Sequence, residues 1–299
     1  MNILELVQQN PQEAIDIVTK AAAAEPDKLD AQQLAAEVCF ELGLAEQAYG
    51  YLQQTLHLDP DGTKGGYVKF LWLGQLIGGK TGINYYKQGI NGLRQQPVEQ
   101  SGPQIIKGLL GMIDIYMTDL CMEPEAEQVC EKLIAEALLL DDNHAEAWSI
   151  LGSIRISQIR NDEAKQALEK SWSLFDKALL EAQLDTTSMP ALVRLAQSMI
   201  ELEMADLVLD LTTQATRLDD QVPDLYYLNA LAHQQLMAQE SDPAELNRHN
   251  AAIRDAIELL SQLDESVDPE MAAASNELVA SLPPLTEPVL ESDDENVEE

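Results

Sequence analysis

Carboxylate side chains dominate the chemistry that this sequence could carry out. The chain has 52 Asp and Glu residues against 18 Lys and Arg residues, which gives a formal net charge of -34. Ionised carboxylates accept charge-assisted hydrogen bonds, and Arg often donates two of them to one carboxylate. The alternative is that these carboxylates only face water. The candidates for binding a Lys- and Arg-rich segment are Asp30, Glu37, Glu41, Asp61, Asp114, Asp119, Glu146, Glu201, Asp224 and Tyr227.

Catalytic chemistry has no comparable pattern. The four histidines, His57, His144, His233 and His249, are expected in different helical repeats, and none forms an H-E-x-x-H motif with another. The sequence has neither a P-loop nor a dinucleotide-binding glycine motif. We therefore expect no catalytic residue, no cofactor site and no metal site, and a protein that is not an enzyme.

The candidate carboxylates could share a surface only if the elements that carry them stack in register. One segment has the spacing of a tetratricopeptide (TPR) repeat, a pair of antiparallel helices of about 34 residues. In it, the small Gly152 lets the second helix approach the first, and Leu168 fills the remaining space. The residues that match the TPR spacing are Trp148, Leu151, Gly152, Ala164, Leu168, Ser171 and Asp176.

The same spacing recurs along the chain, which predicts an array of stacked helix pairs. The first helix of the array is predicted over Ile3–Gln9. The last repeat fits if about ten extra residues lie in the turn between its helices, at the helix-breaking Ser241-Asp242-Pro243. The second helix of that repeat is expected to bury Ala252, Ala256 and Leu259.

Two looser repeats lie between residues 65 and 142. In the first, Gly82, Tyr86 and Gly89 keep a small-large-small spacing after a helix that is predicted over Val68–Ile77. Because glycine destabilises helix interiors, the pair Gly78-Gly79 is expected at a helix end.

Composition agrees with an all-helical protein. The chain is 45% hydrophobic but only 5% aromatic, and no alternating run of β-branched residues predicts a strand. We predict an all-α TPR solenoid of about six to seven helix pairs over residues 1–281, followed by an acidic, disordered tail over residues 282–299. Cys39 and Cys130 fall at repeat core positions, where reduced, buried thiols are expected. The sequence has no long apolar run and no secretory signal pattern, so we expect a soluble protein.

Negative charge is spread over the whole chain. Twelve acidic residues and no Lys or Arg follow Leu263, so 40 acidic residues still face 18 basic ones before it. Such a surface repels nucleic-acid phosphates and anionic membranes. We expect neither as a direct partner, and instead a strongly basic protein. The acidic tail would either solubilise the chain or add a second contact to that partner.

Two longer stretches carry a family resemblance. They read "AEPDKLDAQQLAAEVCFELG" and "LDPDGTKGGYVKFLWLGQLIGGKTGINYYKQGI", and within the second Phe70–Leu76 and Tyr85–Ile90 are more specific than a generic TPR repeat. The chain resembles the family of dedicated TPR assembly chaperones of large-subunit ribosomal protein four. The resemblance implies that it binds this newly made ribosomal protein, shields its long basic internal loop, accompanies it into the nucleus and releases it on the pre-60S ribosome.

The sequence and the family resemblance also lead to expectations about cellular location and oligomeric state. No cluster of Lys and Arg could serve as a nuclear import signal. The chain is therefore expected in the cytoplasm and in the nucleus, which it would enter with its basic cargo. Apart from that cargo, we expect a monomer.

Two other classes of TPR protein remain as alternatives. A co-chaperone adaptor would bind the acidic tail of a heat-shock protein through Lys, Asn and Arg, whereas Gln33 and Glu37, and then Ser149 and Ser153, stand at the corresponding positions. A general protein–protein interaction scaffold is the other alternative, because the fold serves many partners. A pull-down at graded salt would separate the three.

Overall fold

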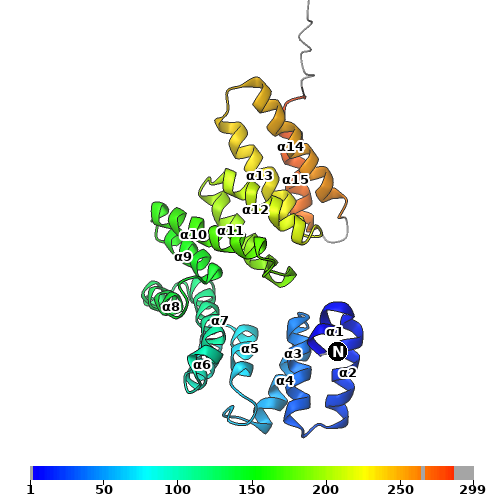
Figure 1. Cartoon of the computed structure of the whole chain (residues 1–299), viewed down its shortest axis with the longest axis vertical. Coiled ribbons are helices and arrows are strands. Elements are labelled where there is room, and N and C mark those ends of the chain that lie inside the picture. Colours follow the sequence, from blue (N-terminus) through cyan, green and yellow to red (C-terminus); the bar gives the residue numbers. More distant parts are fainter. Residues whose placement is uncertain (1–2, 264–266, 286–299) are drawn as a thin grey trace, which may run out of the picture. The chain divides into compact units, whose positions relative to one another are not determined.

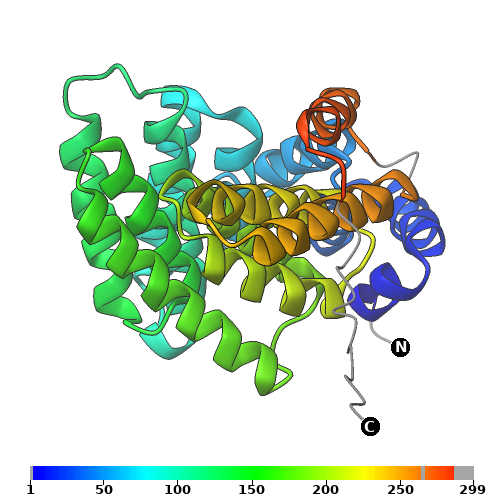
Figure 2. The same cartoon turned by 90° about the horizontal axis from the view of Figure 1, so that it is seen from above.

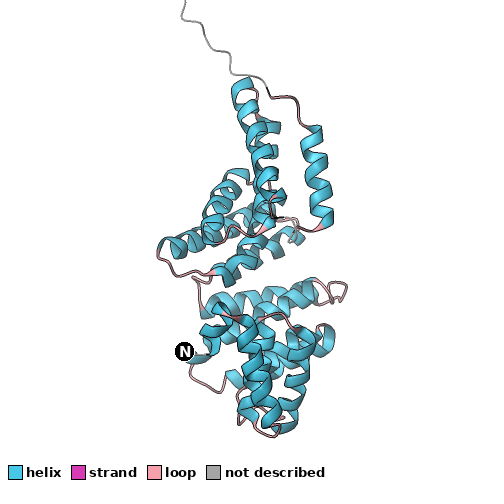
Figure 3. Ribbon diagram, turned by 90° about the vertical axis from the view of Figure 1, so that its right-hand side faces the viewer, coloured by secondary structure: helices cyan, strands magenta, loops and turns pink. Residues whose placement is uncertain are grey.

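The computed structural model describes residues 3–263 and 267–285, and every regular element in these residues is a helix (Figure 3). The chain divides into two compact units, Met1–Asn143 and His144–Glu299. The first unit contains α1 (Ile3–Gln9), α2 (Pro11–Ala24), α3 (Leu29–Glu41), α4 (Ala45–Leu58), α5 (Val68–Ile77), α6 (Gly79–Leu93), α7 (Val98–Met117) and α8 (Ala126–Leu140) (Figure 1). The second contains α9 (Ala145–Ser157), α10 (Asn161–Leu180), the 3-10 helix η1 (Thr186–Ser188), α11 (Met189–Glu201), α12 (Ala205–Leu218), α13 (Pro223–Gln239), α14 (Pro243–Ser261) and α15 (Pro269–Ser281).

Successive helices form pairs of the predicted kind in both units. The predicted helices Ile3–Gln9 and Val68–Ile77 have the bounds of α1 and α5. Gly78 and Gly79, with φ of 65° and 52°, join α5 to α6 in the left-handed region that favours glycine. The all-α TPR fold is confirmed, and the described residues contain seven helix pairs and α15. A single solenoid over residues 1–281 stays a prediction.

Close contact between helices explains the small residues of the repeat. A Cβ atom on Gly152 of α9 would overlap the side chain of Leu168 on α10, which is fully buried. The buried hydroxyl of Ser171 donates a hydrogen bond of 2.8 Å to the carbonyl oxygen of Ala145. The predicted register of this repeat is therefore confirmed, although Trp148 is only half-buried.

Glycine spacing also sets the contact between α5, α6 and α7. Tyr86 of α6 is buried between Gly74 of α5 and Gly111 of α7. A Cβ atom at Gly74 would lie 2.6 Å from the Tyr86 ring, and one at Gly111 would overlap its hydroxyl oxygen. Burial, together with the charge of Asp114, raises the pKa of Tyr86. Of the predicted small-large-small set, Gly82 faces the backbone of Gly74 and Gly89 faces Leu71, so these two glycines also serve close packing of α6 against α5.

A buried ion pair that the sequence did not predict fixes the connection between α4 and α5. The ammonium nitrogen of Lys69 lies 2.7 Å from Oδ2 of Asp59, and both side chains are fully buried. Asp59 also accepts hydrogen bonds from the backbone N–H groups of Lys64 (3.2 Å) and Gly65 (3.0 Å). Burial alone would raise the pKa of Asp59, but Lys69 and these N–H groups outweigh burial and lower the pKa to about 2.

Left-handed residues end several helices. Gly43 follows α3 with φ of 70°, and Ile159 follows α9 with φ of 60°. In both turns the next N–H donates to the carbonyl oxygen five residues before it, over 2.8 Å and 2.9 Å. The two turns therefore have the same Schellman hydrogen bond, although one has glycine and the other a β-branched residue.

The turn in the last helix pair is shorter than predicted. α13 ends at Gln239 and α14 begins at Pro243, and the two helices run side by side (Figure 2). Asp242 caps α14 by accepting a hydrogen bond of 3.0 Å from the N–H of Ala244. Pro243 stands at the first helical position, where no N–H is needed. The predicted insertion of about ten residues in this turn was wrong, because the extra residues lengthen the two helices.

The face that α14 buries also differs from the prediction. Leu259 is 47% exposed, whereas its neighbour Leu260 is 2% exposed. Ile253, Ala256 and Ile257 pack with residues of α13 and α15 in one apolar cluster. The burial predicted for Leu259 was therefore wrong, because α15 covers an adjacent face of α14.

The cysteines of the first unit are free thiols. Cys39 and Cys130 are buried, as predicted, whereas Cys121 is exposed. Burial raises the pKa of Cys130 to about 11, so this thiol stays protonated at neutral pH. Among the described residues, none of the helices combines the length and the apolar character that a membrane span requires.

Candidate partner-binding site

Three of the predicted carboxylates lie on one face of α3. Asp30, Glu37 and Glu41 are separated by seven and four residues, which places them in one row along the helix. We call this row the α3 acidic face. Asp30 and Glu41 are exposed, and Glu37 is half-buried. Neither Glu37 nor Glu41 has a hydrogen-bond or ion-pair partner among the residues that the structure describes.

The electrostatics of Glu37 favour a cationic partner. Burial, followed by the charge of Glu41, raises the pKa of Glu37 above its ordinary value of 4.5. A carboxylate that is partly desolvated and repelled by its neighbour gains more from a bound cation than a fully hydrated one. Glu37 is therefore the residue of the α3 acidic face from which we expect the largest contribution to binding.

An aromatic pair lies next to this face and was missed in the sequence. Phe40 of α3 and Trp72 of α5 have ring centroids 5.7 Å apart with an interplanar angle of 32°. Both side chains are half-buried, and Phe40 directly precedes Glu41. Aromatic rings beside carboxylates can stack with the guanidinium group of Arg. The signal in the sequence was Trp72 within the "FLWLGQL" stretch.

The connection from Asp59 to Tyr67 contacts the same helix. Nε2 of Gln33, on α3, donates a hydrogen bond of 2.7 Å to the carbonyl oxygen of Gly65. The Asp59–Lys69 ion pair holds the start of this connection. The ion pair and the Gln33 hydrogen bond together position this connection against α3.

Two predicted site residues of the first unit have structural partners. Asp61 accepts hydrogen bonds from the N–H (3.2 Å) and the hydroxyl group (2.8 Å) of Thr63, as in a local turn. Asp119 accepts a hydrogen bond of 2.7 Å from the N–H of Gly79 at the start of α6. Asp114 is exposed on α7. That these three residues contact a partner stays a prediction.

The predicted residues of the second unit lie on α9, α11 and α13, the first helices of its pairs. Glu146 forms an ion pair of 2.5 Å with Arg194 across α9 and α11. Glu201 is exposed at the last position of α11, and Asp224 lies in the first turn of α13. Tyr227 packs against the cluster formed by α13, α14 and α15. Their role in binding also stays a prediction.

Two histidines that were expected in different repeats are in contact. Nδ1 of His233 on α13 lies 3.0 Å from Nδ1 of His249 on α14. Burial, and then the nearby His249, lowers the pKa of His233. The expectation of four separate histidines was wrong, because α13 and α14 form a single pair. No group of three or more His, Cys, Asp or Glu residues in the described part of the chain could hold a metal ion.

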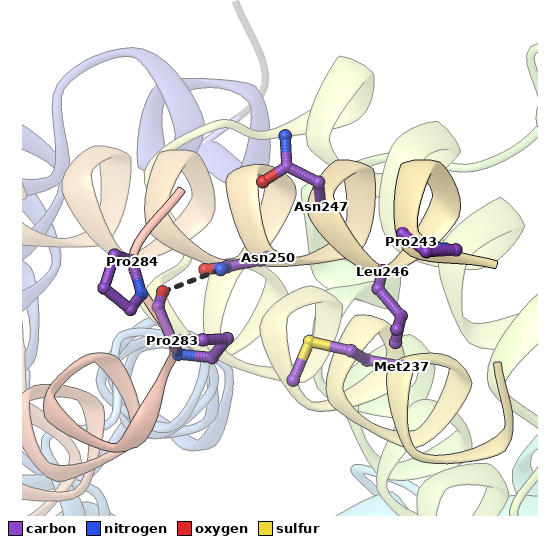
Figure 4. A pocket seen from close by; sticks show the side chains of 7 residues that line it. All are labelled: Met237, Pro243, Leu246, Asn247, Asn250, Pro283 and Pro284. Atoms are coloured by element: carbon purple, nitrogen blue, oxygen red, sulfur yellow. Dashed lines mark hydrogen bonds between the residues drawn. The ribbon is translucent and has the colours of Figure 1, made fainter. Parts of the chain in front are cut away.

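The first residues of the predicted tail are held on α14. Nδ2 of the buried Asn250 donates to the carbonyl oxygen of Pro283 over 2.9 Å (Figure 4). Nη2 of Arg254 donates to the same oxygen over 3.1 Å. A pocket of about 280 Å³ lies beside this contact and is lined by Met237, Pro243, Leu246, Asn247, Asn250, Pro283 and Pro284. Residues 286–299, which form most of the predicted tail, lie outside the described residues.

The fold and the unpaired carboxylates define the class of this molecule, a TPR repeat protein with an acidic helical face. The model of the tetratricopeptide repeat family matches residues 6–64. "Probable assembly chaperone of rpl4" from Schizosaccharomyces pombe is 31% identical over 233 residues, which cover 75% of this chain and 69% of that protein. The protein of the same name from Emericella nidulans is 30% identical over 260 residues, covering 81% and 66%.

A solved structure gives the same result. "Assembly Chaperone of RpL4 (Acl4) (Residues 1-338)" superposes with a TM-score of 0.65 at 27% identity, covering 79% of this chain and 95% of that one. The chain belongs to the family of TPR assembly chaperones of rpl4. It spans about two thirds of the length of the two curated relatives, 69% and 66%.

Proposed function

We propose that this chain is a dedicated, non-enzymatic chaperone that binds newly synthesised large-subunit ribosomal protein four, keeps it soluble and delivers it to pre-60S ribosomes. Membership of the rpl4 chaperone family supports the identity of the cargo. The proposed mode of binding is supported by the α3 acidic face. There, Glu37 and Glu41 have no hydrogen-bond or ion-pair partner among the described residues.

The chemistry of this face suits a Lys- and Arg-rich segment such as the long internal loop of the cargo. The carboxylates of Glu37 and Glu41 can accept hydrogen bonds from guanidinium or ammonium groups. Phe40 and Trp72 offer an aromatic surface beside them. Acid protonates Glu37 at a higher pH than an ordinary carboxyl group. As the pH is lowered, binding should therefore begin to weaken before the pH reaches the ordinary carboxyl value of 4.5.

Release of the cargo requires no nucleotide in this mechanism. Ribosomal RNA presents a denser array of negative charge and competes for the same Lys and Arg side chains. The chaperone, with its net charge of -34, does not bind that RNA itself. We also propose that the chain is a monomer apart from its cargo, and that it works in the cytoplasm and enters the nucleus with this basic protein.

The test is a charge reversal of the α3 acidic face. Asp30→Lys, Glu37→Lys and Glu41→Lys together should weaken binding of purified rpl4 by about a hundredfold or more, because three attractive contacts become repulsive. Helical circular dichroism should stay unchanged, since Asp30 and Glu41 are exposed and the half-buried Glu37 has no hydrogen-bond or ion-pair partner among the described residues. Binding would be measured by surface plasmon resonance at several salt concentrations.

A matched variant controls for net charge. Glu169→Lys, Glu258→Lys and Glu277→Lys change the charge equally at exposed helix positions of the second unit. This variant should keep most of its affinity at high salt. Equal losses in both variants would show that the α3 acidic face is no specific site. Recovery of a heat-shock protein instead of rpl4 would favour the co-chaperone alternative.

A further inference from the structure

The second unit has a cleft lined by α12, α13 and α14, and none of the candidate site residues is among its lining residues. It lies between α12 and α14 and above the first turns of α13, and its volume is about 320 Å³. The lining residues are Thr212, Thr213, Thr216, Leu225, Tyr226, Asn229, Ala252, Asp255, Ala256 and Leu259.

The cleft is open because α14 has two adjacent apolar stripes and one of them is only partly covered. Ile253 and Ile257 pack into the cluster with α13 and α15. Ala252, Ala256 and Leu259 follow the i, i+4, i+7 spacing of an adjacent stripe. The TPR spacing predicted that this stripe is buried. Ala256 is buried and packs in the same cluster, whereas Leu259 is 47% exposed.

The polar groups of the cleft define the kind of partner that would fit. Its floor is apolar, with Leu225 fully buried and Leu259 exposed at the rim. Asp255 is exposed at the same edge and has no hydrogen-bond or ion-pair partner among the described residues. Tyr226 donates a hydrogen bond of 3.0 Å to the carbonyl oxygen of Asp220, so further acidic residues lie near the cleft. The cleft itself is lined by no Lys or Arg.

We propose that this cleft is a second docking site for the cargo, and that it takes an apolar side chain flanked by Lys or Arg. The apolar side chain would pack on Leu259 at the rim, above the buried floor of Leu225 and Ala256, and the basic group would pair with Asp255. The chain's own acidic tail and a second copy of the chain carry the wrong charge for this site. The inference rests on the proposed function, because it assigns the partner of the cleft to the same basic protein. Two linked contacts would raise the affinity above that of the α3 acidic face alone.

The first experiment compares two charge reversals on one helix. Asp255→Lys lies in the cleft, whereas Glu258→Lys is exposed on the same helix but outside the cleft lining. Asp255→Lys should speed dissociation of purified rpl4 by about fivefold, whereas Glu258→Lys should change it less than about twofold. Melting curves would verify that both variants fold. Equal effects, or no effect of Asp255→Lys, would overturn the cleft as a docking site.

The second experiment locates the cargo directly. A photo-crosslinking amino acid in place of Leu259 should capture rpl4, and the same amino acid in place of Glu258 should capture far less. If rpl4 binds the wild-type chain but is not captured at position 259, the cleft proposal fails and the proposed function stands. A crosslink between two copies of the chain at position 259 would also overturn the proposal. If rpl4 does not bind the wild-type chain at all, both fail.

Discussion

At the scale of single residues, one of the left-handed turns has a β-branched residue at a position that favours glycine. Ile159 has φ of 60° and is 86% exposed, in a turn with the same hydrogen bond as that of Gly43. A β-branched residue is strained in this region, whereas glycine is not. Because the Ile159 side chain is mostly exposed, its contacts offset little of this strain.

Replacing Ile159 should consequently stabilise the second unit. Ile159→Gly is expected to raise the free energy of unfolding by about 1 kcal/mol, since relief of strain exceeds the entropic cost of glycine. Gly43→Ala is the opposite control and should lower it by a similar amount. Urea unfolding followed by circular dichroism measures both. A loss of stability in Ile159→Gly would mean that the isoleucine makes contacts absent from the structure.

The buried ion pair gives a second prediction at this scale. Lys69→Met should lower the free energy of unfolding by about 3 kcal/mol at pH 7, because Asp59 would remain buried without its counter-ion. Because the pKa of Asp59 is lowered in the folded chain, the ion pair contributes its full stabilisation above the ordinary pKa of 3.8. This contribution is lost as the pH falls towards 2. Acid titration should therefore cost the wild type more stability than the variant below pH 3.8. The same acid response in both proteins would contradict the assigned pair.

At the scale of elements, the contact between α13 and α14 includes two imidazoles that face each other. The Nδ1 atoms, 3.0 Å apart, can share one proton but cannot both carry one without repulsion. Glu240, near His249, is the acidic group associated with the pair. The packing of the last helix pair is thereby linked to pH.

The expected result is a loss of stability in mild acid. The pKa of His233 in the folded chain lies below its ordinary value of 6.5, so the unfolded chain binds more protons as the pH falls from 6.5. Stability should be complete above pH 6.5 and decline below it. A variant with His233→Asn and His249→Asn should lose this slope between pH 6.5 and pH 5. Thermal melting at stepped pH measures it, and an unchanged slope would show that other groups cause it.

At the scale of the whole molecule, the charge of -34 governs association with a basic partner. Because Asn250 and Arg254 bind Pro283, a deletion that leaves the fold intact should begin at Thr286. It removes the acidic residues Glu287, Glu291, Asp293, Asp294, Glu295, Glu298 and Glu299.

Deleting residues 286–299 should slow association with rpl4 and weaken binding by about tenfold at low salt. The dissociation rate should change little, because the deletion leaves the structured contacts in place. At high salt the difference should vanish, since long-range attraction is screened over about 10 Å at 0.1 M salt. Stopped-flow association across a salt series measures this effect. Equal association rates at low salt would leave the tail only a solubilising role.

Local signals in the sequence determined the repeat architecture of this protein. Gly152, Leu168 and Ser171 occupy the predicted packing positions, and the bounds of α1 and α5 agree with the prediction. These features depend on neighbours within one helix pair, so their spacing is visible in the chain itself. The acidic balance, which points to a basic partner, is likewise independent of the fold.

Only the tertiary structure decided which side chains meet across elements and which remain free. The Asp59–Lys69 and His233–His249 contacts join residues 10 and 16 positions apart, on elements whose relative rotation no repeat spacing specifies. The exposure of Leu259 depends on α15, because that helix covers a neighbouring face of α14. A helix has several faces that could be buried, and the helices packed around it determine which one is.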